Sequence, residues 1–278
     1  MRTLIRLVGG FVLVAAGCSA AGGVTTLPVT VTELPNGQVS FTAPRTVRGP
    51  LVELRLRNKG QAAHDVQVLR VAGNHGAGEV ADVIGADNAV MPDWMVPAGG
   101  VGAVTPGKTT GATMQLQAGN YYLVDTAMND NDESYARLGG ITPLTVVIGG
   151  STGGLPPARA TITAHEYAFG VPPLAAGTTR VRFENTGKQP HTLIAFPIVG
   201  GATWEQVTQA FLSEGQAQAA PPIDTQNYRQ LAALDAGRSL VTDLTLQKGR
   251  YAFACFLSDR GGGPPHVVLG MLQEVVVG

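Results

Sequence analysis

An internal repeat constrains the fold of this chain more than any other feature. Two segments of alternating apolar and charged residues, 53–57 and 180–184, are each followed by an Asn-x-Gly turn that begins at Asn58 or Asn185. In both copies a histidine lies four residues after the glycine, and a second apolar run then begins. Alternation with period two predicts half-buried strands. Each copy is therefore expected to contain two strands joined at a tight turn.

A second pair of matching segments lies further along the chain. Residues 116–121 and 246–251 share the pattern Leu-Gln-x-Gly-x-Tyr, and the next four residues also align, which places Asp125 opposite Cys255. Two segment pairs in the same order indicate a duplicated domain. The abundance of Gly (37) and Pro (18) favours a turn-rich β fold over helical bundles. We therefore predict an all-β protein built from two tandem Greek-key sandwiches.

The boundaries of these domains are predicted from composition. The Gly- and Pro-rich stretch 149–157 is typical of a flexible, turn-rich linker. One sandwich is then expected at about 26–149 and the other at about 158–278. A capping-box pattern at 203–206 predicts a short insertion helix in the second sandwich, and 79–84 is a candidate for its counterpart in the first.

The N-terminal segment 1–18 predicts export from the cytoplasm. Arg2 and Arg6 precede the apolar stretch 7–16, and small residues lie directly before Cys18. This arrangement looks like a bacterial lipoprotein signal, in which Cys18 is lipidated and anchors the mature protein to a cell membrane. The alternative is an ordinary cleaved signal with an incidental cysteine. Either interpretation places the protein outside the cytoplasm.

The balanced charge excludes some classes of partner. The formal net charge is −1 and the pI is near 6.5, with no basic run to attract nucleic acid. No small-molecule substrate is inferred from the sequence.

The C-terminal segment carries a combination of side chains that suits one metal. Cys255, His266 and Met271 lie on the connection between two predicted strands, and His191 comes from the Asn-x-Gly turn upstream. A thiolate and two imidazoles bind copper in a trigonal arrangement, which a distant thioether completes. Taken singly, each residue also has an ordinary structural explanation; a buried free cysteine, for example, is usually a small core residue. An exported protein rarely leaves a cysteine such as Cys255 unpaired without a reason.

These motifs resemble the cupredoxin family of small blue-copper proteins. The matching features are Asn-x-Gly before His191, Gly-x-Tyr-x-Phe-x before Cys255, and the His-x-x-x-Gly-Met pattern that ends at Met271. The last of these also looks like the type 1 site of copper nitrite reductases. The resemblance implies that His191, Cys255 and His266 are equatorial ligands of one copper ion and that Met271 is the axial ligand. It also implies an exposed histidine edge surrounded by an apolar patch, to which 267–269 contribute.

The chain departs from the family pattern in two places. Ten residues separate Cys255 from His266, more than small electron-transfer cupredoxins have. The first copy keeps His64, but Asp125 replaces the cysteine and no His-x-x-x-x-Met follows. The first sandwich is therefore expected to lack the copper ligands.

Electron transfer through this copper is the function that the sequence favours. It predicts a membrane-anchored carrier whose redox partner is a protein that the sequence does not identify. The alternative is a metal-free cupredoxin-like lipoprotein with a structural or partner-binding role. An enzyme is not expected, because a copper oxidase needs paired His-x-His segments and this chain has five histidines and no such pair.

Overall fold

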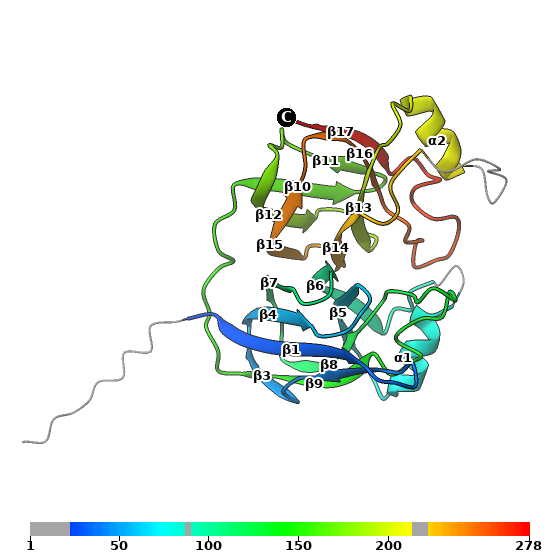
Figure 1. Cartoon of the computed structure of the whole chain (residues 1–278). Coiled ribbons are helices and arrows are strands. Elements are labelled where there is room, and N and C mark those ends of the chain that lie inside the picture. The colour runs from blue at the N-terminus through cyan, green and yellow to red at the C-terminus, as the bar shows by residue number, and fades with distance from the viewer. Residues whose placement is uncertain (1–22, 87–89, 213–221) are drawn as a thin grey trace, which may run out of the picture.

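The fold is almost entirely β (Figure 1). The computed structural model describes residues 23–86, 90–212 and 222–278; the predicted signal segment 1–18, with Cys18, lies outside them. No helix in the described ranges is long and apolar enough to cross a membrane.

The elements fall into two halves that follow one another along the chain. The N-terminal half contains β1 (Thr25–Glu33), β2 (Val39–Thr42), β3 (Thr46–Gly49), β4 (Leu51–Asn58), β5 (His64–Val71), α1 (Ala77–Ile84), β6 (Met95–Val104), β7 (Thr109–Gln115), β8 (Gly119–Val124) and β9 (Ile141–Ile148). The C-terminal half contains β10 (Ala160–His165), β11 (Ala168–Gly170), β12 (Gly177–Asn185), β13 (His191–Pro197), α2 (Trp204–Leu212), β14 (Arg229–Leu234), β15 (Ser239–Leu246), β16 (Gly249–Ala254) and β17 (Leu272–Val277).

Two sheets run through both halves. One has eight strands in the order β11-β10-β12-β15-β7-β4-β1-β2, and the other has nine in the order β17-β16-β13-β14-β6-β5-β8-β9-β3. The two halves meet between β15 and β7 in the first sheet and between β14 and β6 in the second. Read outward from these junctions, and leaving β3 aside, equivalent strands follow one another in the same order in both halves. Both central pairs, β15 with β7 and β14 with β6, are antiparallel. The duplication predicted from the sequence therefore appears as two copies related by a local two-fold arrangement.

The sandwich form follows from the alternation of side chains and from crossovers between the sheets. Leu54 and Leu56 of β4 are fully buried, whereas Arg55 and Arg57 between and after them are exposed. The chain passes from one sheet to the other between β4 and β5 and again between β6 and β7, as in a Greek key. One buried apolar cluster extends through both halves. The predicted all-β, tandem-sandwich class is confirmed, while the boundaries 26–149 and 158–278 stay a prediction.

Hydrogen bonds join the halves directly. The Gln67 side chain of β5 donates to the carbonyl of Ala233 in β14 (3.0 Å) and accepts from its N–H (2.8 Å). A Cβ on Gly102 would lie 1.8 Å from the carbonyl oxygen of Gln230, so only glycine permits this close approach of β6 and β14. The stretch 149–157, predicted to be flexible, is itself tied to the first half through a Gly150 N–H bond to the neighbouring strand.

Each half has a helix at the same place in the chain order. The predicted insertion helix is α2, between β13 and β14, and its capping box forms as expected: Thr203 Oγ1 accepts from the N–H of Gln206, whose side chain accepts from the N–H of Thr203. The counterpart α1 lies between β5 and β6 and begins at Ala77, two residues before the predicted start.

Candidate metal centre

A buried asparagine fixes the first of the four predicted ligands. Asn185, at the end of β12, donates to the carbonyls of Gln189 (2.7 Å) and Leu234 (2.9 Å) and accepts from the Gly187 N–H (2.9 Å). These three bonds close the Asn-x-Gly turn against the neighbouring strand. His191 therefore begins β13 with its side chain fully buried.

Backbone hydrogen bonds close the loop that carries the other three. The Cys255 N–H donates to the Met271 carbonyl (3.2 Å), and the Met271 N–H donates to the His266 carbonyl (2.8 Å). The N–H groups of His266 and Val267 bond back to the carbonyls of Leu257 (2.8 Å) and Cys255 (2.7 Å). The chain between β16 and β17 thus folds onto its own start, which brings residues far apart on the loop to one place.

Three of the predicted ligands converge. Donor atoms of His191, Cys255 and His266 all lie within 4.8 Å of one another, and all three residues are buried. The two Nδ1 atoms are 3.1 Å apart, and the Cys255 Sγ lies 3.5 Å from the Nδ1 of His266. Met271 is also fully buried, and its backbone bonds directly to the cysteine and histidine of the same loop.

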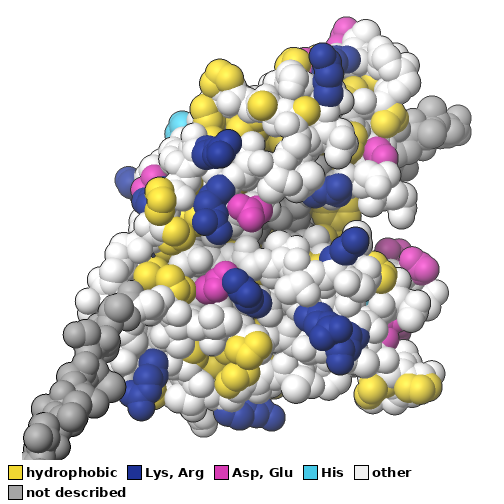
Figure 2. Space-filling model, turned by 60° about the vertical axis from the view of Figure 1, so that its left-hand side comes forward, with side chains coloured by type: hydrophobic (Ala, Val, Ile, Leu, Met, Phe, Trp, Pro, Cys, Tyr) yellow, Lys and Arg dark blue, Asp and Glu magenta, His cyan; other side chains and the backbone are white. Residues whose placement is uncertain are grey.

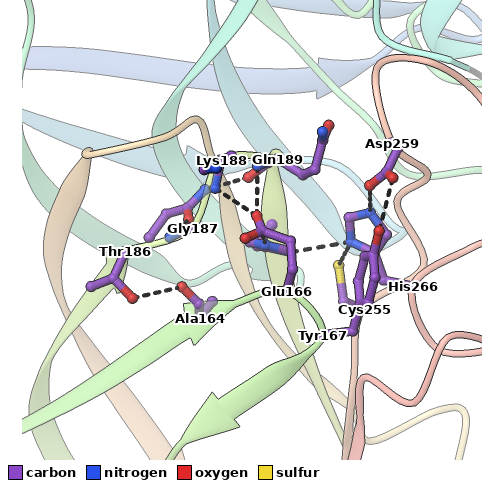
Figure 3. A network of polar contacts seen from close by, with 12 residues as sticks. Ala164, Glu166, Tyr167, Thr186, Gly187, Lys188, Gln189, Cys255, Asp259 and His266 are labelled. Atoms are coloured by element: carbon purple, nitrogen blue, oxygen red, sulfur yellow. Dashed lines mark hydrogen bonds and ion pairs between the residues drawn. The ribbon is translucent and has the colours of Figure 1, made fainter.

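Carboxylates hold the outer edges of both imidazoles (Figure 3). Glu166 Oε1 lies 3.3 Å from the Nε2 of His191, and Asp259 Oδ1 lies 3.1 Å from the Nε2 of His266. The Tyr167 hydroxyl donates to the other oxygen of Asp259 (2.8 Å). Because a carboxylate only accepts, each Nε2 carries the proton and each Nδ1 presents a lone pair to the centre. Outer partners of this kind orient metal-binding histidines.

Burial keeps the centre uncharged without a metal. Burial and the neighbouring His266 lower the pKa of His191 to about 4, and burial also lowers the pKa of His266. Burial raises the pKa of the Cys255 thiol to about 11. Burial alone raises the pKa of Glu166, but hydrogen bonds from the N–H groups of Gln189 and Lys188 outweigh it and hold this pKa at about 2. The imidazoles are therefore neutral and able to bind a metal, and the Cys255 thiol would lose its proton to solvent on binding one.

These donors fit copper. Two imidazole nitrogens, one sulfur and a buried thioether are the set that favours copper in a trigonal site with a weak axial ligand. The Thr192 N–H points at the Cys255 Sγ (3.5 Å), where it would stabilise a thiolate. Glu166 and Asp259 accept from the outer Nε2 atoms, so the atoms that face the centre are the two Nδ1 nitrogens and the sulfur.

The expected exposed histidine edge is absent. His266 is fully buried, because Asp259 and the Tyr167 ring, 5.0 Å from the imidazole, cover its outer side. Within the expected apolar patch, Val268 and Leu269 are exposed but Val267 is buried. The resemblance was therefore wrong about the histidine edge and about Val267.

The first half builds an equivalent loop without the ligands. The Asp125 N–H donates to Gly140, the Gly140 N–H donates to Tyr135, and the Tyr135 N–H donates to Ala127, which repeats the backbone pattern of the C-terminal loop. Tyr135 thus occupies the position of His266, and Gly140 that of Met271. Nine residues separate Asp125 from Tyr135, against ten in the other copy, so the long loop is a property of both halves.

An ion-pair cluster replaces the ligand cluster there. The Nδ1 of His64 lies 2.6 Å from Asp125 Oδ2, and its Nε2 lies 2.9 Å from Glu33 Oε1. Burial raises the pKa of Asp125, which opposes its ionisation. With Asp125 and Glu33 ionised, both ring nitrogens of His64 face acceptors and both are protonated. Burial opposes a charge on His64, but the hydrogen bonds and charges of Asp125 and Glu33 prevail and raise its pKa.

Sequence reasoning missed the carboxylates. Glu33 is the last residue of β1, and Glu166 directly follows the equivalent strand β10. Each accepts two N–H groups from the Asn-x-Gly turn of its own half. Aligning these strand ends would have found them. Asp259 gave no such signal, because it lies in the Gly-rich loop. His165, one residue before Glu166, is exposed.

Comparisons with solved structures return copper proteins. Auracyanin A, a "blue" copper protein from Chloroflexus aurantiacus, is 25% identical over 42% of this chain and 96% of its own (TM-score 0.28). A multicopper oxidase is 11% identical over 91% of this chain and 88% of its own (TM-score 0.25). A Cu-containing nitrite reductase from Thermus scotoductus is 13% identical over 92% and 61% (TM-score 0.23).

No family model matches the sequence, and no curated protein does. Because these TM-scores are low, the assignment of the site depends on the chain itself. Its two-sheet sandwiches, with a His-Cys-His-Met cluster in the second, are cupredoxin-like.

Proposed function

We propose that the protein is an extracytoplasmic electron carrier with one type 1 copper ion, bound by His191, Cys255, His266 and Met271. It is held to a cell membrane by a lipid on Cys18 and exchanges electrons with a protein partner.

One observation carries this proposal: two imidazole lone pairs and a thiol face one another in a buried centre, with their outer edges already fixed. The Nδ1 atoms of His191 and His266 lie 3.1 Å apart, and each ring is hydrogen-bonded through its other nitrogen. Two lone pairs this close repel one another unless a proton or a cation lies between them. A soft cation would relieve this repulsion and take up the Cys255 thiolate.

Each neighbouring residue has a role in such a site. A copper ion bound there would cycle between two oxidation states and so carry one electron. Glu166 and Asp259 hold the two rings, and the Thr192 N–H supports the sulfur charge. The buried strands β13 and β16 pair directly and fix the distance between His191 and Cys255. A centre held this rigidly rearranges little when an electron arrives or leaves.

The remaining histidines support electron transfer over copper catalysis. His64 is held by Asp125 and Glu33, His75 pairs with Glu79, and His165 is exposed at the end of β10. These three residues do not form the paired His-x-His segments that a trinuclear copper cluster needs. We therefore infer a carrier rather than an oxidase.

The partner is inferred to be a protein that docks beside the copper loop. Val268 and Leu269 are exposed there, next to the covered edge of His266. Over the face in Figure 2, Lys and Arg side chains are spread across both halves among Asp and Glu. This mixed charge offers little to nucleic acid on that face. The protein partner is inferred from the exposed apolar side chains Val268 and Leu269.

A copper titration tests the proposal. The purified protein should develop an intense blue or green thiolate-to-copper band that saturates at one ion per chain, and Cys255→Ser should not. Asp125→Asn, at the equivalent position of the first half, is the matched control and should keep the band. Absence of a band in the parent protein would refute the copper proposal and favour the metal-free binding module.

Labelling with a radioactive fatty acid tests the anchor. We expect label in the parent protein made in a bacterial host and none in Cys18→Ser. Equal labelling of the two proteins would contradict the anchor and leave the copper proposal untouched.

A further inference from the structure

Arg260 links the ligand loop, the connection 255–271 between β16 and β17, to the opposite half of the molecule. Its guanidinium donates to the carbonyls of Met91 (3.3 Å), Pro92 (2.8 Å) and Met95 (3.1 Å). It also forms an ion pair with Asp235 (3.1 Å), next to the central strand β14. The side chain is 17% exposed, so these contacts are largely shielded from water. A rigid, forked guanidinium suits this simultaneous binding of several oxygens.

The same residue lies between two supports of the ligand cluster. Asp259, directly before it, holds the Nε2 of His266. The backbone N–H of Arg260 donates to the Gln189 side chain (2.9 Å), on the turn that precedes His191. Arg260 therefore connects the first half to the residues that support both histidines: Asp259, which holds His266, and Gln189, on the turn before His191.

The loop of the first half is held differently. Its residues 126–134 form a local turn in which Asn129 accepts from the N–H groups of Asn131 and Glu133. Its exposed Asp130 stands five residues after Asp125, as Arg260 does after Cys255. Of these two loops, the ligand loop is thus the one that Arg260 binds to the other half of the molecule.

We propose that Arg260 is a positioning residue through which the N-terminal half holds the ligand loop, and with it Asp259 and His266, in the metal-binding arrangement. The half that lacks copper ligands then serves as the support of the half that has them. The effect on copper rests on the proposed function, whereas the effect on the loop does not.

The first test needs no metal. In a Cys18→Ser background Cys255 is the only thiol, so its rate of modification by a thiol reagent in metal-free protein reports opening of the loop. Arg260→Ala should raise this rate about tenfold or more, because buried charge-assisted bonds are lost. Arg260→Lys keeps the charge but loses the fork and should fall between; it also carries the test if the alanine variant does not fold.

Arg137→Ala is the matched control. Arg137 also binds two carbonyls, of Gly85 and Asp82, and one carboxylate, but entirely within the first half. Its thiol rate should match the parent. An unchanged rate in the Arg260 variants, or an equal rise in Arg137→Ala that reveals general unfolding, would overturn the proposal.

The second test is spectroscopic. With copper bound, Arg260→Ala should keep one ion per chain but shift the thiolate band and the copper hyperfine splitting, because the His266 ring is less firmly held. Arg137→Ala should leave both unchanged. Parent-like spectra in Arg260→Ala would refute the positioning of His266. If the parent itself gives no band, the copper proposal fails while the thiol test still decides the role of Arg260.

Discussion

The two halves hold the same loop around two different centres. His64 and His191 begin equivalent strands, and Asp125 and Cys255 each directly follow equivalent strands. In the first half the carboxylate of Asp125 points inward onto the ring of its histidine. In the second half the carboxylates lie outside the rings and sulfur lies inside.

This difference shows what decides between an ion pair and a metal site. The inward carboxylate of Asp125 and the outer carboxylate of Glu33 keep a proton on both ring nitrogens of His64, so this ring offers no lone pair. Outward carboxylates free the Nδ1 atoms of His191 and His266. One fold therefore stabilises a charged cluster in one copy and presents metal ligands in the other.

Breaking the ion pair should give the largest loss of stability. Asp125→Ala leaves the protonated His64 buried with one partner fewer and should lower the free energy of unfolding by about 3–5 kcal/mol. The equivalent change in the metal-free second half, Cys255→Ala, should cost about 1 kcal/mol, because only a small apolar group is lost. Urea denaturation measures both. Equal losses would show that the two centres do not differ in this way.

Adding copper should stabilise the protein through the second half and not through the first. At free copper about 1,000 times Kd, the unfolding free energy should rise by about 4 kcal/mol. Asp125→Asn should show the same rise and Cys255→Ser should show none. Calorimetric melts with and without copper provide the measurement. A rise in Cys255→Ser would place the bound ion elsewhere.

The metal-free halves should respond to pH in opposite directions. His191 has a folded pKa lowered to about 4 by burial and by His266, so its contribution is present above its ordinary value and is lost as pH falls toward 4. At about 1.4 kcal/mol per unit of pKa shift, the loss reaches about 3 kcal/mol. His64 has a raised pKa, and burial beside Asp125 raises the pKa of Asp65 to about 7. Their contributions are present at low pH and are lost as pH rises through these values.

Hydrogen exchange at pH 5 and pH 9 separates these effects. Strand β13 should lose protection at the lower pH and strand β5 at the higher pH. Loss of protection in both strands in the same direction would contradict the assigned protonation states.

The smallest change should come from the axial position. Met271→Leu should keep the copper and its thiolate band but raise the reduction potential, because the oxidised ion loses a weak donor. Met128→Leu, an exposed methionine of the first half, is the control and should leave the potential unchanged. Redox titration measures both. A lower potential in Met271→Leu would argue against Met271 as a ligand.

Local patterns predicted the repeated elements well. Three patterns appear where expected: the alternation at 53–57 and 180–184, the Asn-x-Gly turns and the capping box at 203–206. Each depends on interactions between residues that are close in the sequence. The four ligand residues could be predicted for the same reason, because the motifs that resemble the cupredoxin family place three of them on one loop. The structure brings His191, Cys255 and His266 together.

Long-range pairing could not be predicted in this way. The sheet that continues from β7 into β15 depends on contacts between residues more than 100 positions apart, which leave no periodic pattern. The contacts of Asp259 and Arg260 arise in an irregular Gly-rich loop, whose path only the folded halves define. The covering of His266 by Tyr167 follows from the same packing.

A crystal structure of the copper-soaked protein, with anomalous data on both sides of the copper edge, locates the metal. We expect one strong anomalous peak, between the Nδ1 atoms of His191 and His266 and the Sγ of Cys255, with Met271 facing it. We expect no peak beside His64. A peak at His64, or none at Cys255, would refute the assignment of copper to the second half alone.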